Sequence, residues 1–67
     1  MQRVHQEFAS AGFDLSISHS EKFDCYRAEW REAGAESIAG STVSKSQEEA
    51  AVYALSQLRR SLAIAGT

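Results

Sequence analysis

Residues 46–65 read SQEEAAVYALSQLRRSLAIA, and this stretch decides the fold expected for the whole chain. Ser46 and Glu49 have the Ser-x-x-Glu spacing of a capping box, in which each side chain accepts a hydrogen bond from the other residue's backbone N–H. The apolar residues that follow recur at the spacing of one helix face: Ala51, Leu55, Leu58 and Leu62, flanked by Ala50 and Ala54. We therefore predict a helix over residues 46–65, ended by Gly66, whose apolar stripe packs on a sheet.

The first eleven residues predict a second, shorter helix. Their apolar residues Val4, Phe8 and Ala11 share one helix face. Gly12 follows at the position of a C-terminal cap. Because a helix of this length is marginal alone, we expect Phe8 to be buried against another element.

The middle of the chain alternates between apolar and polar residues, which is the pattern of half-buried strands. Three strands are predicted, over residues 13–19, 23–32 and 36–43. In the second strand Tyr26, Ala28 and Trp30 share one face, and we expect both aromatic side chains in the core rather than on an exposed stacking platform. In the third strand, Gly40 weakens the pairing or marks a bulge.

Helix, three strands and helix, in this order, predict an α+β fold of two layers, α-β-β-β-α, in one compact domain over residues 1–67. A three-stranded antiparallel sheet would bury one face against both helices and leave the other face in water. A core of this size is only marginally stable unless packing is efficient or a partner helps, so self-association is also expected.

The composition is that of a folded chain with little net charge. Hydrophobic residues make up 43% of the chain and charged residues 24%. The formal net charge of -2 disfavours RNA or DNA binding, which would need a local basic patch. The chain has one cysteine, so it forms no internal disulfide, and it has no signal-peptide pattern or apolar run of about 20 residues. We expect a cytoplasmic protein with no membrane segment.

The run AAVYALSQL at residues 50–58 fits the pattern Ala-Ala-x-x-Ala-Leu-x-x-Leu. Together with the order of elements, this run resembles the double-stranded RNA-binding domain, whose last helix carries that pattern. His19 and Phe23 are similar to the His-x-x-x-Phe with which the family enters its second strand. The resemblance implies the α-β-β-β-α fold and, in the family, binding across the grooves of duplex RNA.

The chain departs from that family at the residues that hold phosphate. In the family, a lysine cluster lies at the start of the last helix. Aligning on the Ala-Ala pair puts Val43, Ser44 and Gln47 at the lysine positions. Lys45 remains nearby, while Glu48 and Glu49 place like charge against an approaching phosphate. We therefore expect the fold to carry over without the RNA binding.

Two other families have a similar Ser/Thr-x-Glu-Glu-Ala helix start after three strands. The HicB-type antitoxins are acidic and bind a protein toxin, which implies an antitoxin-like or phage-encoded regulator. The integrase arm-binding domains read DNA with a basic sheet face, where this chain offers Arg27 and Arg31 interleaved with Glu29. A further basic patch could form on folding from Arg3, Lys45, Arg59 and Arg60.

Residues able to carry catalysis or bind metal are few. His5 and His19 are the imidazoles and Cys25 is the thiol of this chain, and they lack the regular spacing of zinc ligands. Cys25 and His19 could approach one another across a hairpin, but the sequence shows no third group to orient them. We predict no catalytic residue, no metal and no cofactor.

The leading interpretation is a small non-enzymatic binding module that acts through protein contacts or self-association. Val52 and Tyr53 lie partly off the apolar stripe of the last helix. They would form an exposed apolar edge for dimerisation or, alternatively, contact the N-terminal helix. The competing interpretations are nucleic-acid binding through either basic set and the regulator described above.

Overall fold

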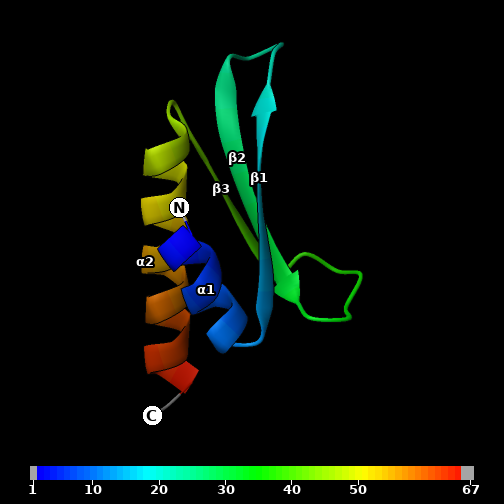
Figure 1. Ribbon diagram of the computed structural model, residues 1–67, viewed down its shortest axis with the longest axis vertical. Coiled ribbons are helices and arrows are strands. Elements are labelled where there is room, and N and C mark those ends of the chain that lie inside the picture. The colour runs from blue at the N-terminus through cyan, green and yellow to red at the C-terminus, as the bar shows by residue number, and fades with distance from the viewer. Residues whose placement is uncertain (1, 66–67) are drawn as a thin grey trace.

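The elements follow one another in the predicted order (Figure 1). A computed structural model describes residues 2–65. It contains α1 (Gln2–Ser10), β1 (Phe13–Ser20), β2 (Cys25–Glu32), β3 (Gly40–Ser44) and α2 (Gln47–Ala65). Both helices cover the same face of the sheet, so the two-layer α+β prediction is confirmed. Neither described helix combines the length and apolar character that a membrane crossing requires.

The sheet is an antiparallel meander with the strand order β1-β2-β3. Its register places Leu15 opposite Trp30 and Ile17 opposite Ala28. Because side chains alternate between the two faces along a strand, these four residues point to the same side, toward the helices. The alternation in the sequence therefore predicts the buried face of β1 and β2 correctly.

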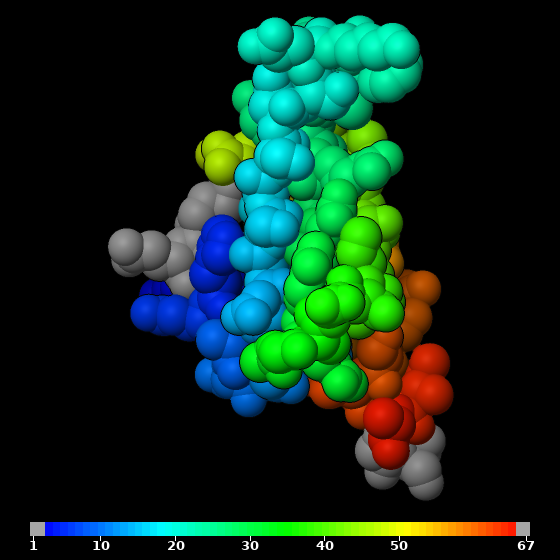
Figure 2. All heavy atoms as spheres, turned by 90° about the vertical axis from the view of Figure 1, so that its right-hand side faces the viewer, coloured from blue at the N-terminus to red at the C-terminus, as the bar shows by residue number. Residues whose placement is uncertain are grey.

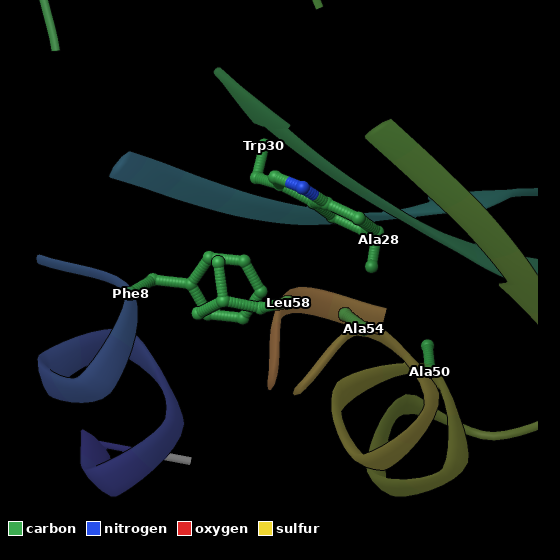
Figure 3. Close-up of a cluster of buried hydrophobic side chains, with 6 residues drawn as sticks. All are labelled: Phe8, Ala28, Trp30, Ala50, Ala54 and Leu58. Carbon is green, nitrogen blue, oxygen red and sulfur yellow. The ribbon is translucent and has the colours of Figure 1, made fainter. Parts of the chain in front are cut away.

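The core lies between the sheet and the two helices (Figure 3). It contains the buried side chains of Phe8, Ala28, Trp30, Ala50, Ala54 and Leu58. The rings of Phe8 and Trp30 pack at a centroid distance of 5.4 Å, and Trp30 is only 6% exposed. The core position of Trp30 is thus confirmed, and an exposed stacking platform is excluded. Tyr26 is half-buried and packs against the same cluster.

Gly40 is required by the packing of Trp30. The two residues are direct partners in the β2–β3 ladder. A Cβ added at Gly40 would overlap the indole ring, lying 2.6 Å from its Cε2 atom. The predicted bulge is therefore wrong: Gly40 is regularly paired, and its missing side chain leaves room for the indole.

Two strands begin later than predicted. β2 begins at Cys25 because Asp24 adopts a left-handed backbone conformation, with φ of 48°, that interrupts the extended chain. Phe23 therefore lies in the turn rather than entering a strand. β3 begins at Gly40, and residues 36–39 form a loop in which Ile38 is 51% exposed.

The buried stripe of α2 differs from the predicted one at its far end. Its buried residues are Ala50, Ala51, Ala54 and Leu58. Leu55 is half-buried, but Leu62 is 46% exposed, so its place in the stripe was wrongly predicted. The reason is length, because the last turns of α2 run past the ends of the strands (Figure 1). The predicted stop at Gly66 lies outside the described residues.

Ser46 caps α2 as predicted, but the capping box forms only one of its two bonds. The Ser46 hydroxyl accepts a hydrogen bond from the backbone N–H of Glu49 at 3.1 Å. The Glu49 carboxylate instead accepts a hydrogen bond from the hydroxyl of the buried Ser44, at 2.7 Å. Glu49 therefore ties the end of β3 to the first turn of α2.

Helix α1 ends where the sequence predicts. Its last turn is closed by the bond from the Ala11 backbone N–H to the Glu7 carbonyl, at 3.2 Å. Gly12 then takes a left-handed conformation, with φ of 88°, and turns the chain into β1. This turn leaves Phe8 fully buried in the core.

Candidate binding surface on the open face of the sheet

The face of β1, β2 and β3 that points away from the helices, which we call the open face, is turned toward the viewer in Figure 2. The strand registers place mostly short polar side chains on it. It alternates with the buried face and comprises Asp14, Ser16, Ser18, Cys25, Arg27, Glu29, Arg31, Ser41 and Val43. Serine side chains are too short to keep another surface at a distance. The open face can therefore be approached closely by a partner.

A hollow of about 590 Å³ lies on this face near the β1–β2 turn. Its lining includes Ser18, Ser20, Phe23, Cys25, Arg27 and Val43. The hollow forms where β3 stops: Ser44, the last residue of β3, pairs with Tyr26, while β1 and β2 continue to the turn. We call this feature the open-face hollow. Its apolar walls are Phe23 and Val43, which are both exposed.

The turn that carries Phe23 is held by contacts on the opposite side of the hairpin. His19 Nε2 lies 3.2 Å from Asp24 Oδ1, and the His19 ring packs on Tyr26 at 4.8 Å. Asp24 itself has the left-handed backbone conformation described above. Phe23 is consequently 72% exposed at the tip of the molecule, with Lys22 Nζ 5.3 Å from its ring centroid.

The arginines of the open face are balanced by acids on the same face. Arg27 Nη1 lies 3.7 Å from Glu29 Oε1. Arg31 stands opposite Asp14 in the register, and its Nη1 donates a hydrogen bond to the Glu36 carbonyl at 3.5 Å. The face thus alternates positive and negative charge. It does not present the uniform positive potential on which phosphate binding depends.

The other predicted basic residues do not gather into one patch. Arg59 and Arg60 belong to α2, in the layer opposite Arg27 and Arg31. Lys45 precedes α2, and Arg59 lies roughly 18 Å along the helix axis from its first residue, at 1.5 Å per residue. Arg3 is exposed on α1. The four residues therefore do not form one patch, whereas Arg27 and Arg31 share the open face and are interleaved with Glu29.

Arg59 is engaged by α1 instead. Its Nε and Nη2 atoms donate to the two carboxylate oxygens of Glu7, at 2.8 and 3.0 Å. These hydrogen bonds hold the pKa of Glu7 below its usual range and raise the pKa of Arg59. The pair bridges the two helices, and it leaves Arg59 less able to act as a free cation for phosphate.

Two of the regions that would meet duplex RNA in the RNA-binding family, the β1–β2 turn and the start of the last helix, are net acidic here. The β1–β2 turn carries Lys22 against Glu21 and Asp24. The start of α2 carries Lys45 against Glu48 and Glu49, and all three are exposed. Each region thus has one more negative than positive charge, which opposes an approaching phosphate backbone.

Val52 and Tyr53 are both exposed on α2. Consecutive helical residues point about 100° apart, so the two side chains leave α2 in different directions. Val52 lines a shallow groove with Val4, Glu48 and Ala51, on the side of α1. The proposed contact with the N-terminal helix thus has a structural basis for Val52 alone.

Cys25 and His19 do not face each other. Cys25 points to the open face, whereas His19 pairs with Tyr26 on the helix side and contacts Asp24. Residues 2–65 contain no group of three or more His, Cys, Asp and Glu side chains placed to hold a metal ion.

No known protein family, curated protein or solved structure matches this chain. The open face and the open-face hollow are therefore the features from which we infer a function. Phe23 was missed as a surface residue because the second strand was predicted to begin at residue 23, although Phe23 is out of phase with the apolar residues Tyr26 and Trp30. The signal that could have found it is the polar surrounding of Glu21, Lys22 and Asp24, which is typical of a turn.

Proposed function

We propose that this protein is a small non-enzymatic binding module, on a fold of the double-stranded RNA-binding type, that recognises another protein surface through its open face. The observation that carries the proposal is Phe23, a large apolar side chain that is 72% exposed and borders the open-face hollow. An aromatic residue held at a turn tip is a typical anchor of a protein interface. We also propose a cytoplasmic location, because Cys25 is a free thiol and thiols stay reduced in the cytoplasm.

The hollow fits an apolar side chain supplied by the partner. Phe23 and Val43 would contact such a side chain from two sides, while Arg27 and Glu29 offer a charged rim beside them. This combination of an apolar centre and a polar rim is the usual anatomy of a protein–protein contact. A regulator of the antitoxin-like or phage-encoded kind would belong to this functional class.

Nucleic-acid binding is the weaker alternative. Arg27 and Arg31 are the basic residues that share a face, and Glu29 and Asp14 offset them. A phosphate backbone would have to displace the Arg27–Glu29 pair and approach Asp14 beside Arg31, and both reduce the electrostatic gain that normally drives such binding. The charge pattern of the open face favours a partner that carries both signs.

The test is selection of random peptides displayed on phage against the wild-type protein. Selected peptides should carry an apolar residue and lose binding to Phe23→Ser and Val43→Thr. Val52→Thr is the matched control, because Val52 is a similarly exposed valine outside the open face. Binders that tolerate both open-face changes would refute the proposed function.

A further inference from the structure

The ends of the open face carry complementary apolar features. At one end lies the hollow between Phe23 and Val43. At the other end the loop over residues 33–39 reaches out on the open side (Figure 1) and carries the exposed Ile38. The bond from the Ala39 N–H to the Trp30 carbonyl, at 2.7 Å, places Ile38 just beyond the level of Trp30.

The hollow beside Phe23 and the loop residue Ile38 lie on opposite sides of Ala28, at nearly equal distances along the strands. Phe23 precedes Ala28 by five positions along the hairpin. Gly40 pairs with Trp30, so Ile38 lies about four positions on the other side of Ala28, at the roughly 3.3 Å rise of a strand. A two-fold axis across the strands at that level would exchange the two ends. It would bring Ile38 of one copy to the hollow of the other.

The charged side chains of the open face are related by the same two-fold axis. Arg27 and Glu29 flank Ala28 on the open face. The axis that exchanges the ends of the face also sets Arg27 of each copy over Glu29 of the other, which gives two reciprocal pairs. Val43 and Ser41, their partners on β3, likewise exchange. A two-fold interface is necessarily self-complementary in this way.

We propose that the partner recognised by the open face is a second copy of this chain, packed face to face about a two-fold axis at the level of Ala28. This inference rests on the proposed function, since it names the protein bound there. Ile38 fills the hollow of the opposite copy, and Arg27 pairs with Glu29 across the interface. The serines of β1 and β3 permit the ~10 Å spacing of stacked sheets.

The size of the face predicts a weak dimer. Three strands of at most eight residues give a footprint of roughly 400 Å² per copy, about half of the ~800 Å² that each partner of a standard interface buries. The dissociation constant should therefore lie in the micromolar to submillimolar range. Dimerisation must therefore be measured at protein concentrations that extend to about 1 mM, the upper limit of that range.

The charge symmetry provides a specific experiment, with molecular mass measured by sedimentation. In Glu29→Arg, two arginines meet two arginines across the axis, and in Arg27→Glu, acids meet acids. Each variant alone should dissociate at least tenfold more readily than the wild type, because like charges at an interface are costly. An equimolar mixture of the two restores opposite charges at both positions, so it should form a heterodimer.

Two further variants test whether a change in dimerisation comes from the interface or from the change in net charge. Arg60→Glu makes the same charge change on α2, outside the open face, and should leave the dimer intact. Ile38→Thr should weaken the dimer by roughly tenfold, as expected when an apolar anchor is removed. Circular dichroism spectra equal to the wild type confirm that each variant is folded.

The outcomes distinguish the two proposals. A wild-type chain that remains monomeric up to 1 mM, or single variants that dimerise like the wild type, would overturn the dimer. If the chain is monomeric and selected peptides still require Phe23, the proposed function stands and only the partner is wrong. If neither a dimer nor a Phe23-dependent peptide is found, both proposals fail.

Discussion

The indole of Trp30 occupies the space in front of Gly40, its direct partner in the neighbouring strand. This contact seats the largest side chain of the core between β3 and Phe8 of α1. The sheet, the first helix and the second helix therefore meet around one ring. Anything that moves this ring disturbs both layers.

Replacing Gly40 with alanine should destabilise the protein. The added methyl group overlaps the indole, and relieving that overlap typically costs about 1–3 kcal/mol of unfolding free energy. Urea unfolding followed by Trp30 fluorescence measures the change. Ser41→Ala, one residue further along on the open face, should stay within about 0.5 kcal/mol of the wild type. Equal stability of Gly40→Ala and the wild type would show that β3 can move away from Trp30.

The Ser46 hydroxyl should contribute to stability through its bond to the Glu49 backbone N–H. Ser46→Ala removes this N-cap and should lower the unfolding free energy by about 1 kcal/mol. The control is Ser56→Ala, an exposed serine within α2, which should raise stability slightly because alanine is the better helix former. The two substitutions are chemically identical, so equal effects in chemical denaturation would argue against the cap.

The pair of Glu7 and Arg59 should make stability depend on pH. Because the folded state lowers the pKa of Glu7, its contribution is present above the ordinary glutamate pKa, about 4.3, and is lost as pH falls through the lowered value. Glu7→Gln should be less stable than the wild type at pH 7, by a small margin because the pair is exposed. Urea titrations at pH 7 and in acid should show this margin shrinking toward zero. A margin that grows in acid would have the wrong sign.

Duplex nucleic acid should not bind, even at low salt. The β1–β2 turn and the start of α2 are net acidic, and the arginines of the open face alternate with acids along their strand. A gel-shift titration with duplex RNA of about 16 base pairs, and with the matching DNA, should show free probe throughout. A complex that weakens steeply as salt rises would contradict the charge argument.

The fold was predictable because its signals are local. The alternation in β1 and β2 and the helical spacing of Ala50, Ala54 and Leu58 depend only on neighbouring residues. The errors arise where distant residues decide the outcome. Gly40 reads as a weak strand residue until Trp30 is placed against it, and Leu62 reads as core until the length of the sheet is known.

The candidate site was harder to predict than the fold. Phe23 was predicted to open the second strand, and the left-handed conformation of Asp24 takes it out of the strand. The pairing of Ile38 with the hollow depends on register and on the loop after β2, neither of which is written in a short motif. The basic residues were visible in the sequence, but their separation into two layers required the fold.

We infer that the open face is the surface used for binding and that a second copy of the chain occupies it. The most direct measurement compares backbone amide NMR shifts of the wild type from dilute solution to about 1 mM. We expect the amide shifts of Phe23, Arg27, Glu29 and Ile38 to depend on concentration and those of Tyr53 and Arg60 on α2 to stay unchanged. Spectra that do not change with concentration, or changes confined to α2, would contradict it.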